Sequence, residues 1–239
     1  MSGWDGNLIL LDTASSGLFR ASLFAPCKVS DSSCLELTVN AALPRILTGI
    51  PELGVDSADP QFNDVIEVKL PTLKLLLFNS TLTGFKDCRL SNITFNEDMT
   101  SVHCNAYCPS FNLHGQYDMI GQLISLPIQG NGDFSFHTGL FLVTVDTQLE
   151  KNKGNDGKTH FLIKKFKVNS VPTKPITYEF TNLFNGKKEL ADAIHKFAND
   201  NWLKITSLIQ YPIWYKSLDT LSKSVNKYLE YVAVEDSLI

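Results

Sequence analysis

Apolar and polar residues alternate along most of the chain between Val65 and Tyr178, and many of the apolar positions carry β-branched or aromatic side chains. A period of two residues is typical of β-strands. The predicted strands span 65–70, 73–83, 89–95, 102–108, 111–117, 121–128, 133–148, 159–168 and 176–180. Turn-forming residues separate them at 96–100, 130–132 and 152–157. Because no helix is predicted between these strands, we expect an antiparallel meander and not a parallel sheet.

After Gly186 the apolar residues recur every three or four positions, which predicts a helix. The stripe consists of Leu190, Ile194, Phe197, Ile205, Leu208, Tyr215, Leu218, Leu221, Val225, Leu229 and Val232. Asn201 and Pro212 interrupt it, and we expect one helix of about 45 residues, roughly 65 Å long, bent at Pro212. Such a helix has to run the full length of an elongated molecule.

A second helix is predicted to begin near Ser32 or Ser33, either of which can cap it, and to end near Gly49. Pro44 predicts a kink in this helix. Residues 1–26 show no convincing period. We therefore predict an N-terminal extension over 1–25, either a degenerate signal sequence or disordered, and one domain over 26–239.

Together these patterns indicate an α+β fold in which a strongly curved antiparallel sheet wraps a long C-terminal helix. Antiparallel strands need only one apolar face, and the helical stripe supplies a surface to cover it. With 239 residues, of which 44% are hydrophobic and 19% charged, the chain can bury a sizeable core.

The charge balance argues against some partners. The formal net charge of −4 gives no basic excess for binding a nucleic acid. Lysines cluster at 164–167 and 187–188, but we interpret them as solvated faces and not as a membrane-binding surface. No apolar run approaches the roughly 20 residues that span a bilayer, so we expect no stable membrane insertion.

The five cysteines cannot all pair within one chain. Cys27 and Cys34 flank a polar loop that favours turns, and we predict a disulfide between them, the alternative being two reduced thiols. If the 96–100 turn closes a hairpin centred near Asp98, then Cys88 lies opposite Cys108. A second disulfide between these two leaves Cys104 free; the alternative is three small buried apolar residues.

Neither a metal site nor a catalytic centre is indicated. His103, Cys104 and Cys108 form the only metal-like grouping, and no second pair of ligands follows as a zinc site requires. A thiol enzyme would need a base beside Cys104, yet neighbouring strand residues such as His103 point to opposite faces. We expect no enzyme activity, no cofactor and no metal.

The signals for secretion conflict. Asn79 and Asn92 begin weak sequons for N-glycosylation. The start of the chain is a poor signal peptide, because no basic residue precedes the short apolar run at 8–11 and Asp5 and Asp12 flank it.

Several motifs from about Pro26 to the C-terminus resemble those of the insect takeout and juvenile-hormone-binding-protein family. They are Cys27-x6-Cys34 with Asp31 and Leu35, Ile50-Pro-Glu-Leu-Gly54, Asp59-Pro60, Gly115-x-Tyr117, Gly121-x-Leu-Ile-x-Leu-Pro-Ile-x-Gly-x-Gly132, Thr181-Asn-Leu-Phe-Asn-Gly-Lys-Lys-Glu-Leu190 and Phe197-x3-Asn201-Trp202. The takeout branch is the nearer one, since no cysteine after Cys108 can form the second bridge of juvenile-hormone-binding proteins. The resemblance implies a TULIP-like fold, an internal hydrophobic tunnel, secretion, and carriage of a terpenoid, juvenile-hormone-like or other lipid without catalysis.

On this interpretation the inward-facing apolar residues of the sheet and helix form the tunnel wall. The candidates are Phe111, Tyr117, Leu123, Phe134, Phe136, Phe161, Ile163, Phe180, Phe184, Ile194, Phe197, Trp202 and Ile205. For each of them core packing is the alternative, because a core and a tunnel wall share one composition. Tyr117 and Trp202 add a polar atom that can orient a ligand. We expect a monomeric carrier; the alternative is a protein-interaction module of the same fold with a filled core and an exposed apolar patch.

Overall fold

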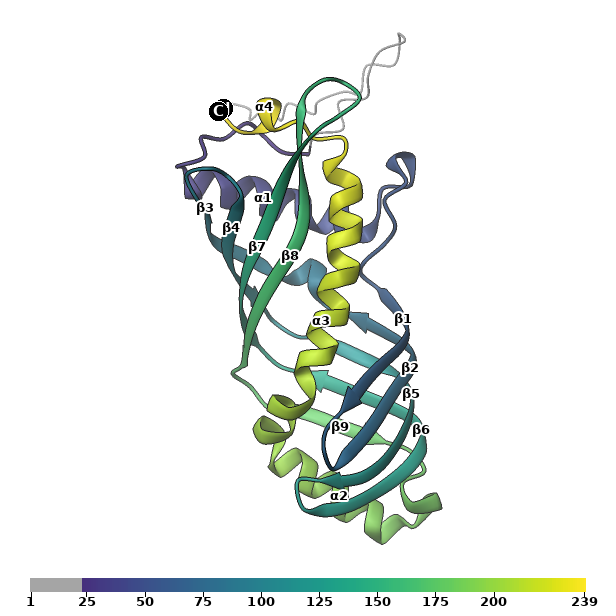
Figure 1. The fold of residues 1–239 in the computed structure, drawn as a ribbon. Helices are drawn as coiled ribbons and strands as arrows, with labels where there is room; N and C mark the ends of the chain where they lie inside the picture. The colour runs from purple at the N-terminus through teal and green to yellow at the C-terminus, as the bar shows by residue number, and fades with distance from the viewer. Residues whose placement is uncertain (1–22) are drawn as a thin grey trace, which may run out of the picture.

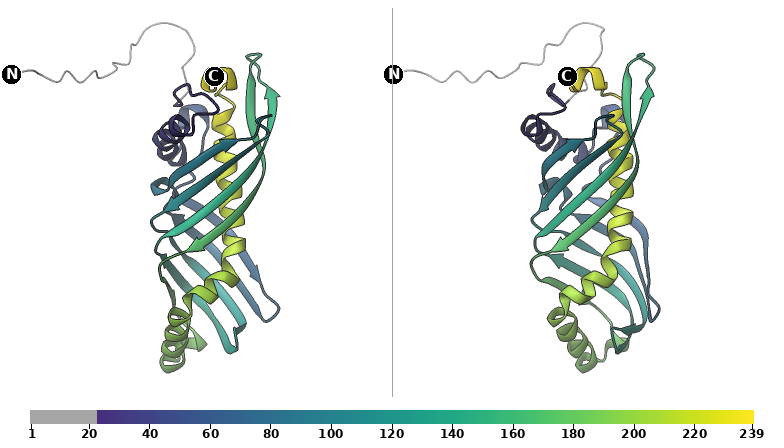
Figure 2. Two further views of the ribbon diagram at one scale, coloured as in Figure 1. Left: turned by 90° about the vertical axis from the view of Figure 1, so that its left-hand side faces the viewer. Right: turned by 60° about the vertical axis from the view of Figure 1, so that its left-hand side comes forward.

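A computed structural model describes residues 23–239 and shows an elongated molecule built along one long helix (Figures 1 and 2). The helices are α1 (Ser32–Thr48), α2 (Lys188–Asp200), α3 (Trp202–Leu229) and α4 (Val234–Ser237). The strands are β1 (Gln61–Lys69), β2 (Leu73–Thr83), β3 (Arg89–Phe95), β4 (Ser101–Cys108), β5 (Asn112–Leu123), β6 (Leu126–Thr138), β7 (Phe141–Lys153), β8 (Thr159–Pro172) and β9 (Ile176–Phe180). Three short 3₁₀ helices cover Pro51–Leu53, Phe85–Asp87 and Phe184–Gly186.

The strands form two antiparallel sheets. One has the order β1-β2-β5-β6-β9 and the other the order β3-β4-β7-β8. Both curve around α3, with α1 beside the four-stranded sheet and α2 at the opposite end of the molecule (Figure 1). The predicted fold class, a curved antiparallel wrapping around a long C-terminal helix, is confirmed, although the meander is divided between two sheets.

The predicted single C-terminal helix is wrong in one respect, since it breaks at Asn201 into α2 and α3. Asn201 has φ −108° and ψ 25°, and its side-chain amide donates to the carbonyl of Phe197 at 2.8 Å. An asparagine that hydrogen-bonds the preceding turn competes with the helical backbone. Pro212, where the bend was expected, lies within the continuous helix α3.

Two strand predictions also need correction around Gly130 and Gly139. The predicted 130–132 turn is part of β6, where Gly130 pairs with Met119, and the β5–β6 turn lies instead near Ile124, which has φ 61°. A Cβ on Gly130 would lie 2.7 Å from the hydroxyl of Tyr117, so this glycine makes room for a buried ring. The predicted 133–148 strand is divided between β6 and β7.

The ends of the described chain meet over the α1 end of the molecule. Asp31, and not Ser32 or Ser33, caps α1 by accepting from the amide of Cys34 at 3.0 Å. Cys27 donates its amide to the carbonyl of Ser237 at 3.0 Å, and Ile239 donates to the carbonyl of Cys27 at 2.9 Å. The two termini therefore form one cover.

Two disulfides cross-link the half of the molecule that contains α1. Cys27 and Cys34 join the N-terminal segment to α1, and Cys88 and Cys108 join the open ends of the β3–β4 hairpin. Cys104 is a free thiol. These are the pairs given by the loop and hairpin arguments from the sequence.

Candidate functional site

An apolar cavity of about 240 Å³, called cavity A here, lies under the cover formed by the chain ends. Its walls come from α1, α3, the four-stranded sheet and both terminal segments. The lining residues are Phe24, Ala25, Cys27, Leu35, Thr38, Val39, Leu90, Ile93, Phe95, Val102, Cys104, Thr147, Leu149, Phe161, Ile163, Val225, Leu229, Val232, Ser237 and Leu238.

A second cavity of about 210 Å³, cavity B, lies next to cavity A, toward the middle of α3. Its lining residues are Leu43, Leu47, Phe85, Cys88, Leu90, Cys104, Ala106, Cys108, Val143, Val145, Thr147, Ile163, Phe166, Trp214, Leu218, Leu221, Ser222 and Val225. Leu90, Cys104, Thr147, Ile163 and Val225 line both cavities. Cavities A and B are therefore neighbours separated by one layer of shared side chains.

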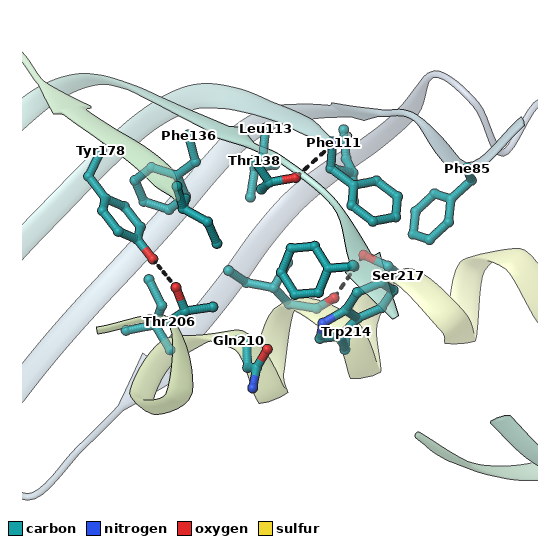
Figure 3. A pocket seen from close by; sticks show the side chains of 15 residues that line it. Phe85, Phe111, Leu113, Phe136, Thr138, Tyr178, Thr206, Gln210, Trp214 and Ser217 are labelled. Atoms are coloured by element: carbon teal, nitrogen blue, oxygen red, sulfur yellow. Dashed lines mark hydrogen bonds between the residues drawn. The ribbon is translucent and has the colours of Figure 1, made fainter. Parts of the chain in front are cut away.

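A smaller cavity of about 70 Å³, cavity C, lies further along α3 and shares Phe85 and Trp214 with cavity B. Figure 3 shows it between Phe85 and Trp214 at one end and Phe136 and Tyr178 at the other. Trp214 contacts Phe85, Phe111 and Phe141, with ring centroids 5.4–6.0 Å apart. This cluster of four rings separates the larger cavities from cavity C.

Among residues 23–239, no charged side chain lines any of the three cavities. Their few polar groups are mostly occupied: the hydroxyl of Tyr178 lies 2.6 Å from that of Thr206, and Ser217 donates to the carbonyl of Ile213 at 2.8 Å. Burial raises the pKa of Tyr178 to about 12, so its phenol stays neutral. Such walls favour a neutral apolar guest and penalise an ion.

The free thiol of Cys104 points into cavities A and B, while its neighbour His103 lies on the outer face of the sheet. There the Nδ1 atom of His103 is 2.7 Å from a carboxylate oxygen of Asp146. Burial, with a smaller contribution from Asp146, raises the pKa of Cys104 to about 11. A neutral thiol on the opposite face from its nearest histidine is not an activated nucleophile.

The buried thiol gives a direct way to observe the cavities. At pH 7.5 we expect maleimide to modify Cys104 roughly 10 to 100 times more slowly than a free thiol, because the raised pKa leaves less thiolate. The rate should increase as the pH rises toward 11. A saturating apolar ligand should slow it further, and mass spectrometry of the intact protein measures the reaction. Cys104→Ala should be unreactive; labelling as fast as that of free cysteine would contradict the buried position.

The thirteen residues predicted from the sequence to line a tunnel fall into two groups. Phe111 and Phe136 line cavity C, Phe161 lines cavity A, and Ile163 lines cavities A and B. The others line none of these three cavities, and they lie toward the α2 end of the molecule. They are Tyr117, Leu123, Phe134, Phe180, Phe184, Ile194, Phe197, Trp202 and Ile205.

Sequence reasoning missed much of the wall near α1 and the four-stranded sheet. Leu90, Cys104 and Thr147 line both large cavities but are not among the residues predicted from the sequence to form the tunnel wall. The alternation of side chains along β4 could have identified part of this wall, because Val102 and Cys104 face the cavities while His103 faces outward. Three members of the predicted helical stripe, Leu190, Leu208 and Tyr215, are exposed.

The sequence also bears on glycosylation, metal binding and membrane insertion. Asn79 and Asn92 are both exposed, and their glycosylation stays a prediction. Among residues 23–239 no three His, Cys, Asp or Glu side chains come together as a metal site would require. In the same part of the chain, no helix combines the length and the apolar character needed to span a bilayer.

Comparison with known proteins agrees with this architecture. The circadian clock-controlled protein daywake of Drosophila melanogaster is 27% identical over 202 residues, which cover 77% of this chain and 75% of daywake. Daywake of Drosophila yakuba is 24% identical over 194 residues, covering 74% of this chain and 72% of that protein. The crystal structure of Epiphyas postvittana Takeout 1 superposes with a TM-score of 0.84 at 25% identity, covering 89% of this chain and 98% of Takeout 1.

The family described as haemolymph juvenile hormone binding protein matches residues 8–238, almost the whole chain. Members of this family bind small hydrophobic ligands. The fold, the apolar walls of the cavities and the sequence match thus agree, and the chain belongs to the haemolymph juvenile hormone binding protein family.

Proposed function

We propose that this protein carries one small, neutral, apolar molecule in cavities A and B. The observation that carries the proposal is the wall itself: two adjoining cavities of about 240 and 210 Å³ whose described lining residues include no charged side chain. Burial of apolar surface stabilises a complex by roughly 25 cal/mol per Å², less the cost of immobilising the ligand. A terpenoid, a juvenile-hormone-like ester or another neutral lipid has the required chemistry.

The ring cluster around Trp214 sets the inner boundary of the proposed binding site. A guest in cavities A and B would meet the rings of Phe85 and Trp214 at its inner end. Cavity C behind them has about 70 Å³ and accepts at most the end of a chain. Continuity of the three cavities into one tunnel belongs to this proposal and requires the rings to move.

We further propose that the protein acts outside the cell as a monomer. Disulfides persist in oxidising compartments, and this chain has two. The family description names the haemolymph, which is consistent with this location. Catalysis is not part of the proposal, because burial keeps the thiol of Cys104 neutral and no histidine among the described residues lines the cavities into which it points.

The experiment compares a neutral ligand with its charged counterpart. Dodecanoic acid and its methyl ester should each displace the fluorescent dye N-phenyl-1-naphthylamine, and at pH 8 the ester should bind at least about 10-fold more tightly. The described walls of both cavities offer the carboxylate no cationic partner. Its affinity should rise as the pH falls through the pKa of the acid, about 4 to 5. Equal affinities at pH 8 would contradict the neutral-ligand assignment, and absence of dye binding would contradict the carrier function.

A further inference from the structure

The seam between strand β8 and helix α3 lies directly outside cavity B. Ile163 and Phe166 of β8 line this cavity from one side of the seam, and Leu218 and Val225 of α3 line it from the other. β8 is an edge strand of its sheet, so it has no further strand to pair with on that side. The seam is therefore a place where the cavity wall is closed only by contacts between a strand and a helix.

Hydrogen bonds fasten the seam at its two ends. At one end the side-chain amide of Asn226 accepts from the backbone amide of Ile163 at 2.7 Å and donates to its carbonyl at 3.0 Å. At the other end Ser170 donates to the side chain of Gln210 at 3.1 Å. The strand from 163 to 170 spans about 23 Å and the helix from 210 to 226 spans about 24 Å, so two segments of matching length run side by side between the fastened ends.

Between these two hydrogen-bonded ends, side-chain packing closes the seam. Within the described structure no hydrogen bond joins 164–169 to α3, and the β7–β8 pairing is interrupted by a bulge at Lys164. The seam is closed there by the ring of Phe166 against Tyr215, with centroids 5.5 Å apart. Tyr215 is 55% exposed and stacks in turn on the exposed ring of Tyr211 at 6.3 Å. An apolar path thus leads from the surface over Tyr211 and Tyr215 to Phe166 and cavity B.

We propose that the ligand enters and leaves through this seam. The rings of Phe166 and Tyr215 close the opening, and the hydrogen bonds of Asn226 hold one end of the seam together. This inference rests on the proposed function and deepens it by assigning the route. Displacement of one ring opens a gap without breaking any backbone hydrogen bond of the sheets. A ligand that slides along the aromatic path keeps its apolar surface largely out of water during passage.

The test measures rates rather than affinity, with N-phenyl-1-naphthylamine as the probe in stopped-flow fluorescence. Tyr215→Ala removes the outer of the two rings that close the opening. The Tyr215 side chain lines none of the three cavities. In this variant the association and dissociation rates should both rise at least about 5-fold, with the dissociation constant changed less than about 2-fold. Asn226→Asp, which removes the donor to the carbonyl of Ile163, should raise both rates in the same way.

Matched variants serve as controls. Tyr107→Ala removes a tyrosine of similar exposure, 49%, from the outer face of β4. Asn199→Asp changes an equivalent clamp on the edge strand β9, where Asn199 accepts from the amide of Tyr178 at 2.8 Å and donates to its carbonyl at 3.4 Å. Aspartate removes the donor to this carbonyl. Both controls should keep the wild-type rates.

Rates of Tyr215→Ala that equal those of the wild type would overturn the route. So would rates that respond instead to Asp236→Asn, which breaks the ion pair with Lys158 at 2.7 Å beside the terminal cover. Because Tyr215→Ala changes an exposed side chain, it decides the matter even if Asn226→Asp fails to fold. A wild-type protein that binds no dye would instead contradict the proposed carrier function.

Discussion

Replacement of Val225 by tryptophan should abolish binding of apolar ligands while leaving the protein folded. Val225 lines both large cavities from α3, so an indole at this position occupies space in each. We expect a loss of affinity of at least about 100-fold, equivalent to about 2.7 kcal/mol. The cavities can accept the ring, and the cost to stability should stay within the 1–3 kcal/mol typical of overpacking. Dye titration together with thermal unfolding measures both quantities.

Leu203→Trp is the matched control, because Leu203 lies on the same helix but is exposed and lines none of the three cavities. This variant should bind the dye as the wild type does. Retained affinity in Val225→Trp would show that the ligand does not occupy cavities A and B. Slower maleimide labelling of Cys104 in Val225→Trp would give independent support, since both side chains line the same cavities.

Replacement of Tyr117 by alanine should have the opposite profile, with a large loss of stability and little change in affinity. The Tyr117 side chain is fully buried, its ring lies 4.8 Å from that of Phe180, and its hydroxyl donates to the carbonyl of Thr181 at 2.6 Å. Loss of a buried aromatic ring typically costs about 3–5 kcal/mol. Urea unfolding with the disulfides intact measures this cost.

Tyr117→Phe keeps the ring and removes only the hydroxyl, so it should lose about 1–2 kcal/mol. Neither variant should alter the dissociation constant of the dye under conditions in which the protein is folded, because Tyr117 lines none of the three cavities. A loss of affinity in Tyr117→Phe would mean that the ligand reaches the α2 end of the molecule and touches this hydroxyl.

Much of the fold follows from local patterns in the sequence. β2, β3 and β9 have the predicted bounds, because each alternates cleanly between flanking turn residues. The break at Asn201 and the strand through Gly130 were missed for different reasons. The break at Asn201 comes with a local side-chain hydrogen bond to the carbonyl of Phe197, which competes with the helical backbone. Gly130 lies within a strand where it makes room for the hydroxyl of Tyr117, a contact that a turn signal in the sequence does not show.

The candidate site was less predictable than the fold. Phe161 and Phe180 both occupy alternating strand positions, yet only Phe161 borders a large cavity. The difference depends on how the curved sheets approach the helices, and that distance is a property of the whole molecule. A cavity is a volume that side chains leave unfilled, so no single residue marks it in the sequence.

The cover over cavity A has a consequence for protein synthesis. It pairs Cys27 with Ser237 and Ile239, which are among the first and last described residues. Strands β1 to β9 all leave the ribosome before α3, the helix that packs against their inner faces. The cover over cavity A therefore forms only after Ser237 and Ile239 have left the ribosome, and until then the apolar inner faces stay open to other chains.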